Sequence, residues 1–137
     1  MKNALIFVTG LTLTLSASVN GAEIASFDPS LLHLNGSYCT FERKPHEIIL
    51  AGDWAGKYWM KVDGKMIELV SHTADAEAER HLASKRWHET LRGADVEVEL
   101  RLVELGRGED SAAYKGYLTI SRRGASTRMS VKGGCGA

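Results

Sequence analysis

The sequence has no excess of charge of either sign. Its 137 residues include 17 Lys and Arg and 17 Asp and Glu, so the formal net charge is zero. A neutral chain lacks the basic field that attracts nucleic acid or anionic lipid from a distance. We therefore predict that its partners do not include nucleic acid.

The sequence also lacks the common motifs of catalysis. Gly-x-Ser-x-Gly, Ser-x-x-Lys, the phosphate-binding loop and the dinucleotide fingerprint are all absent. The five histidines contain no His-Glu-x-x-His pair, so we predict no metal site. We expect no cofactor either. An enzyme, which would be a hydrolase with unusual catalytic residues, is the least favoured of three function classes.

The N-terminal apolar run is too short for a membrane span and is typical of an export leader. Lys2 precedes the uncharged stretch Ala4–Leu15, and small residues follow. Cleavage is expected after Ala22, with Gly21 as the alternative. No Cys stands beside this run for lipid attachment. We predict a signal peptide over residues 1–22 and a product without a membrane anchor, in the periplasm or secreted.

The sequence contains only two cysteines, both in the single domain expected over residues 23–137. Cys39 lies near the start of that domain and Cys135 near its end. Redox or metal chemistry usually needs a Cys-x-x-Cys pair or additional ligands, and neither occurs. In an exported domain we therefore predict a Cys39–Cys135 disulfide. The glycines around Cys135 suit a backbone that bends through positive φ to reach its partner.

Short alternating segments predict a mostly β domain. Asp63-Gly64 is a strong hairpin signal between two of these segments, because both residues tolerate the positive φ of a tight turn. The clearest alternation starts at Val96, where apolar residues alternate with Glu97, Glu99 and Arg101. The expected strands cover residues 37–41, 48–50, 57–62, 66–70, 96–103, 114–121 and 127–132.

One segment predicts a helix instead. Residues 75–88 are rich in Ala, Glu, Arg and Lys, and a thin apolar stripe that ends at Trp87 could rest on a sheet. An ordered loop is the alternative. The predicted fold class is mostly β, with α+β as the alternative. It is a small antiparallel barrel or sandwich of about seven strands with one covering helix.

The candidate binding residues lie between positions 54 and 61. Trp59 between Lys57 and Lys61 places an aromatic ring and two cations on the outward side of a strand, close to Trp54. Tryptophan and flexible cations suit recognition of a protein. The competing interpretation is that Trp59 packs under the helix against Trp87.

The layout resembles the small periplasmic inhibitors of c-type lysozyme. The shared features are a leader, an early Cys39, a strand pair over residues 62–69 with the sequence Val-Asp-Gly-Lys-Met-Ile-Glu-Leu, and a late Cys135. The resemblance implies an antiparallel barrel with a terminal disulfide. The inhibitory Ser-Gly loop of that family has no counterpart in this sequence, so no inhibitory residue is assigned.

The favoured function is that of an exported, disulfide-linked binding protein. It would recognise or inhibit a protein partner in the cell envelope, such as an enzyme. The alternative is a module that binds a small ligand or glycan, for which Trp54, Tyr58 and Trp59 could provide a stacking surface.

Overall fold

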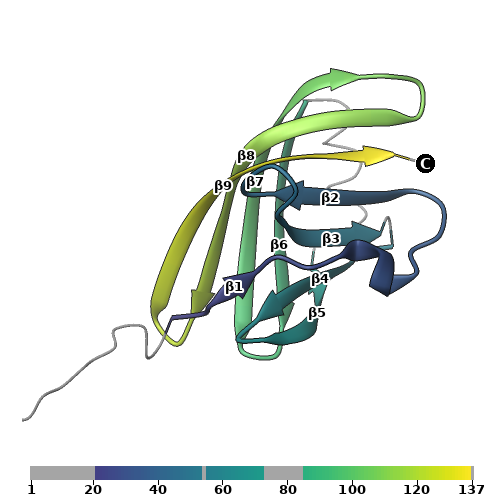
Figure 1. The fold of residues 1–137 in the computed structure, drawn as a ribbon. Helices are drawn as coiled ribbons and strands as arrows, with labels where there is room; N and C mark the ends of the chain where they lie inside the picture. The colour runs from purple at the N-terminus through teal and green to yellow at the C-terminus, as the bar shows by residue number, and fades with distance from the viewer. Residues whose placement is uncertain (1–20, 54, 73–84, 137) are drawn as a thin grey trace, which may run out of the picture.

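A computed structural model describes residues 21–53, 55–72 and 85–136, drawn in colour in Figure 1. These residues form nine strands and one short 3-10 helix, η2 (Pro29–Leu32). No helix in this described part of the chain is long and apolar enough to cross a membrane. The strands are β1 (Ile24–Ala25), β2 (Tyr38–Glu42), β3 (Ile48–Asp53), β4 (Lys57–Val62), β5 (Lys65–Ser71), β6 (Arg86–Gly93), β7 (Val96–Arg107), β8 (Ser111–Arg122) and β9 (Ala125–Gly136).

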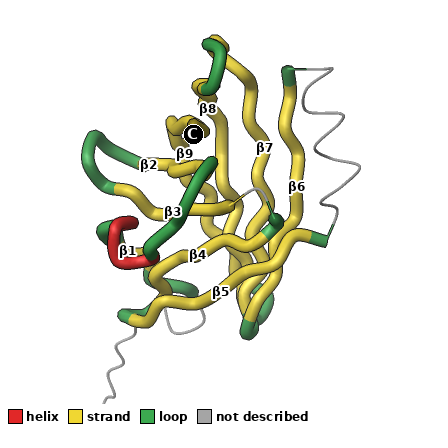
Figure 2. Tube along the Cα trace, turned by 90° about the vertical axis from the view of Figure 1, so that its right-hand side faces the viewer, coloured by secondary structure: helices red, strands yellow, loops and turns green. Residues whose placement is uncertain are grey.

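Eight of these strands form one closed antiparallel barrel. The strand order is β1-β4-β3-β2-β9-β8-β7-β6-β5, and a further pairing between β4 and β5 closes the sheet on itself. Figure 2 shows β3, β4 and β5 crossing one side of the barrel while β6 and β7 run up the other. The short strand β1 pairs with the end of β4 as a ninth strand outside the closed ring. The structure therefore confirms the antiparallel barrel, with eight strands instead of about seven.

The expected helix is wrong where the structure can test it. Residues 73–84 lie outside the described residues, but Arg86–Gly93 is strand β6. Along β6 the side chains of Trp87, Glu89 and Leu91 are buried in alternation. A carboxylate at the central inward position hides the two-residue period in the sequence. The sequence pattern therefore places Trp87 in a helical stripe, although it lies in a strand.

The hairpin prediction at Asp63-Gly64 is confirmed. These residues have φ values of 50° and 80°, and Val62 pairs with Lys65 across the turn. The predicted alternation along β7 is also confirmed, since its apolar positions are buried from Val96 to Leu102. Strands β7, β8 and β9 are longer than expected, because each has 12 residues. The connection between β7 and β8 is correspondingly short and consists of residues 108–110.

The hydrophobic core fills the barrel interior. Every strand contributes at least one buried side chain, because inward and outward positions alternate along the pleat. The largest side chains that are almost fully buried are Tyr114, Phe41, Ile49, Leu50, Met60, Leu69, Leu91, Leu100 and Leu118.

Candidate functional site

The disulfide joins β2, near the start of the described chain, to β9 at its end, and these two strands are neighbours in the sheet. Cys39 on β2 and Cys135 on β9 are directly opposed, with 4.0 Å between their Cα atoms and a sequence separation of 96. Their exposed fractions are 2% and 6%. The predicted pairing is therefore confirmed. The bond is buried between two paired strands of the barrel, which is the position of a structural disulfide.

The glycines beside Cys135 act differently from the sequence prediction. Gly133, Gly134 and Gly136 are not among the residues with positive φ, so the chain does not bend to reach Cys39. They instead continue β9, which pairs with both β2 and β8. A Cβ atom on Gly133 would lie 2.2 Å from the carbonyl oxygen of Thr40. Gly133 thus permits the close approach of the two strands next to the disulfide.

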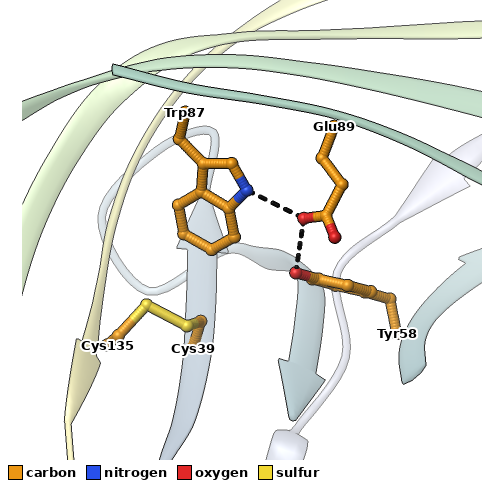
Figure 3. The surroundings of a disulfide bond; sticks show 5 residues. All are labelled: Cys39, Tyr58, Trp87, Glu89 and Cys135. Carbon is orange, nitrogen blue, oxygen red and sulfur yellow. Dashed lines mark hydrogen bonds between the residues drawn. A yellow bond between two sulfur atoms is a disulfide. The ribbon is translucent and has the colours of Figure 1, made fainter. Parts of the chain in front are cut away.

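A carboxylate lies inside the barrel, close to this disulfide. Glu89 is 6% exposed, and its Oε2 atom accepts two hydrogen bonds. The hydroxyl of Tyr58 donates at 2.9 Å and the indole Nε1 of Trp87 at 2.8 Å. Figure 3 shows both donors converging on this one oxygen. Among the described residues, none donates to Oε1 and no cation pairs with Glu89.

This arrangement holds a polar group in an apolar interior. Burial raises the pKa of Tyr58 well above its ordinary value, and the nearby Glu89 charge raises it further. Two neutral donors offset part of the cost of burying a carboxylate, but they provide no opposite charge. The sequence alone did not reveal Glu89, because an acidic residue in a strand usually faces solvent.

Trp87 also organises the aromatic part of the core. Its ring meets Phe41 and Tyr114 edge to face, with centroid distances of 5.8 and 5.3 Å. The alternative in which Trp59 packs against Trp87 under a helix is therefore wrong. Trp87 faces the barrel interior, whereas Trp59 occupies an outward position of β4.

The predicted binding residues share the outward face of β4. Lys57 is exposed, and Trp59 and Lys61 are half-buried. Trp54 lies outside the described residues. Trp59 pairs with Glu68 on β5, and exposed Met66 and Val70 flank that position. The three residues therefore lie together, and their role in binding stays a prediction.

Tyr58 and Trp59 do not form the common stacking surface expected for a ligand. Tyr58 is 3% exposed and its hydroxyl reaches Glu89 in the interior, whereas Trp59 is on the opposite side of the strand. Successive side chains of a strand point to opposite faces, which separates these two rings.

A second outward surface lies on the wall formed by β2, β9, β8 and β7. Here a cleft of about 540 Å³ runs over the strands and the loop after β2. Val103 and Tyr117, 48% exposed each, supply apolar surface. We call this surface the basic cleft, because its lining has four cationic side chains and one carboxylate. They are Arg43, Lys44, Lys115, Lys132 and Glu42.

Two lysines of the basic cleft face each other directly. Lys115 on β8 and Lys132 on β9 are paired positions, and both are exposed. Like charges in directly opposed positions of a sheet are destabilising. Glu42 is opposite Lys132 on β2, but its carboxylate accepts a hydrogen bond from the backbone N–H of His46. No described carboxylate forms an ion pair with either lysine.

Two other cationic side chains at the basic cleft already have partners within the structure. Arg43 pairs with Glu47 at 2.8 Å. The guanidinium of Arg128 lies over the ring of Tyr117, 5.2 Å from its centroid, which is a cation–π distance. Lys44, Lys115 and Lys132 thus supply the cations that remain available to a ligand.

The histidines show no metal arrangement in the described part of the chain. His88 faces outward on β6, and its Nε2 lies 3.0 Å from Glu99 Oε2. His88 and then Arg101 lower the pKa of Glu99. Among the described residues, no group of three or more His, Cys, Asp or Glu side chains could hold a metal ion.

Comparisons with models of known protein families, with curated proteins and with solved structures found no match for this chain.

Proposed function

We propose that this protein is an exported binding protein that recognises an acidic segment of a protein partner, such as an enzyme, through the basic cleft. The leader signature and the disulfide support export to the periplasm or the medium. The observation that carries the proposal is the direct opposition of Lys115 and Lys132 without an ion pair to a described carboxylate.

The charge of the cleft defines the partner. A fold retains two like charges in opposed positions at a cost in stability, and an anionic ligand would remove that cost. Val103 and Tyr117 provide a floor on which the apolar parts of a peptide can pack. A short acidic segment with one or two apolar residues therefore matches the chemistry of the cleft.

The size of the cleft agrees with a short extended segment. Strands β2, β9, β8 and β7 are consecutive neighbours in the sheet. Three interstrand spacings span about 14 Å, and an extended chain covers that distance with four or five residues. We therefore expect a local epitope and not a large interface.

The proposal is tested with a fluorescent peptide of ten residues, Glu-rich with a central Leu, added to the purified domain. We expect saturable binding that weakens as salt is raised from 0.05 to 0.3 M, since the Debye length shortens. The double variant Lys115→Glu/Lys132→Glu should lose at least about ten-fold in affinity, the loss of one good charged contact or more.

A second double variant controls for the change in net charge. Lys57→Glu/Lys61→Glu makes the same change in net charge on the outward face of β4. If it alone abolishes binding, the predicted Trp59 surface is the binding site and the basic cleft is not. Equal weakening by both variants indicates a general charge effect and contradicts a specific cleft.

A further inference from the structure

The start of the described chain is fastened to two turns at one end of the barrel. The Asp63 backbone N–H donates to the carbonyl oxygen of Glu23 at 2.8 Å, and the Glu23 N–H donates to Asp63 Oδ1 at 3.0 Å. Directly beyond this contact, Ile24 pairs with Val62 as β1 joins β4 (Figure 1). Glu23 is thus held at both its amide nitrogen and its carbonyl.

Arg122, at the end of β8, completes this fastening. Its guanidinium donates to Asp63 Oδ2 through one nitrogen. In the uncut chain the other nitrogen donates to the carbonyl oxygen of Gly21 at 2.6 Å, a contact that cleavage after Ala22 would remove. The Arg122 side chain is only 12% exposed. The hydrogen bond and charge of Arg122, together with the Glu23 N–H, lower the pKa of Asp63 and keep it ionised.

We propose that the mature chain begins at Glu23 and that its new α-ammonium group forms an ion pair with Asp63. This inference rests on the proposed export. A leader peptidase would hydrolyse the Ala22–Glu23 bond. The oxygen of one water molecule becomes part of the Ala22 carboxylate, and both of its protons end on the Glu23 nitrogen, which becomes an ammonium group. The nitrogen that becomes charged is the atom that already lies 3.0 Å from Asp63 Oδ1.

The alternative cleavage after Gly21 places the charge less favourably. It would create the ammonium on Ala22, whose nitrogen belongs to the same peptide group as the Gly21 oxygen that Arg122 contacts. The oxygen and nitrogen of one peptide group lie about 2.3 Å apart, so this ammonium would stand within about 5 Å of the Arg122 guanidinium. Like charges at that distance repel. The Ala22 cleavage brings the charge to a carboxylate instead.

The charged groups around the new terminus come from two turns and from Glu23 itself. Asp63 comes from the β4–β5 turn, and Arg122 and Arg123 come from the end of β8 and its turn. The side chain of Glu23 supplies one more carboxylate, which is exposed. Asp63 therefore serves two cations, the guanidinium and the ammonium. N-terminal amines are recognised in proteins by such carboxylate and backbone contacts.

The first experiment determines the N-terminus. The full 137-residue chain is produced in a bacterial host with a Sec export pathway, recovered from the periplasm, and analysed by intact mass and N-terminal sequencing. A chain that begins at Glu23 is the expected result. A chain that begins at Ala22 or elsewhere overturns this inference but leaves export intact. An unprocessed cytoplasmic chain overturns export as well.

The second experiment measures the ion pair. The α-amine of the chain that begins at Glu23 is titrated by NMR after reductive methylation with labelled formaldehyde, between about pH 6 and 11. Its pKa should be raised above that of the same amine in urea, because a carboxylate within hydrogen-bond distance favours the charged form. Asp63→Asn should lower this pKa by about one unit.

Two features make that variant informative. Asn tolerates the positive φ of position 63, so Asp63→Asn should preserve the turn. Asp95→Asn is the matched control, because it removes a carboxylate that pairs with Arg123 at 3.1 Å while leaving Asp63 intact. An amine whose pKa is the same in the mature protein and in Asp63→Asn, or one that responds equally to Asp95→Asn, contradicts the ion pair.

Discussion

The hydroxyl of Tyr58 donates a hydrogen bond to Glu89 inside the barrel, which connects β4 to β6 at 2.9 Å between oxygens. These strands are not neighbours in the sheet, since β5 stands between them. The contact therefore links two strands that share no backbone pairing, and Trp87 adds a second hydrogen bond to the same oxygen. A polar contact of this kind specifies which side chains meet across an otherwise apolar core.

Removing the carboxylate should destabilise the barrel. Glu89→Ala leaves the Tyr58 hydroxyl and the Trp87 N–H without their acceptor, and we expect a loss of about 1–3 kcal/mol in the free energy of unfolding. Glu89→Gln should lose less, because its amide oxygen can accept both bonds. Urea unfolding at pH 7 measures these losses. Glu97→Ala, at an exposed position, is the control, and a Glu89→Ala protein as stable as that control would contradict the prediction.

The buried Tyr58 hydroxyl predicts that the folded protein loses stability at alkaline pH. The pKa of Tyr58 is raised in the folded state, first by burial and then by Glu89. A raised folded pKa gives stability that is complete below the pKa of the unfolded phenol, about 10, and is lost as the pH rises above it.

Phenolate absorbance recorded beside circular dichroism tests this expectation. Tyr114 also has a raised pKa, caused by burial. The absorbance change of both phenols should therefore be delayed until the barrel unfolds, and Tyr58→Phe should remove about half of that delayed change. If all four tyrosines ionise before any loss of structure, Tyr58 is not held as the structure describes.

The disulfide should contribute strongly to stability. It closes a loop of 96 residues, for which the chain-entropy model gives about 4.7 kcal/mol, and measured losses on removal are typically 2–5 kcal/mol. The variant Cys39→Ala/Cys135→Ala should unfold at correspondingly lower urea concentration. The reducing agent dithiothreitol should destabilise the native protein and leave the variant unchanged. An equal response of both proteins would assign the effect to something other than this bond.

Gly133 should not tolerate a side chain. A Cβ atom there would lie 2.2 Å from the Thr40 carbonyl oxygen and 2.4 Å from Cδ1 of Phe41, so Gly133→Ala must displace backbone. Overpacking of this kind costs about 1–3 kcal/mol. Gly106→Ala is the matched control, because nothing lies within 4 Å of its Cβ position. Thermal unfolding of the two variants should differ clearly, and similar stabilities would contradict the close strand approach.

The opposed lysines predict a conflict between binding and stability. Lys115→Glu places a carboxylate opposite Lys132 and replaces repulsion by attraction. We expect the free energy of unfolding to rise by about 0.2–1 kcal/mol while the affinity for the acidic peptide falls. Urea unfolding and peptide titration of the same preparation measure both effects. A variant that loses stability would show that the two lysines do not repel each other in the folded protein.

Much of the barrel was predictable because its signals are local. The Asp63-Gly64 turn requires positive φ, and the alternation from Val96 to Leu102 requires one buried face. The Cys39–Cys135 bond was also predictable, because the domain has no other cysteine. Strand β6 was missed, since Glu89 stands where the pattern requires an apolar residue. The basic cleft was missed as well, because Lys115 and Lys132 meet only through the register of β8 and β9.

The sequence by itself determined that this chain forms antiparallel strands, where several of them turn, and which two cysteines can join. These properties depend on residues adjacent in the chain and on the two-residue period of a strand. Only the tertiary structure decided that the sheet closes, that Glu89 faces inward, and that Asp63 reaches both Glu23 and Arg122. Each depends on strand register over tens of residues, which the free energy of the whole closed barrel selects and no local pattern encodes.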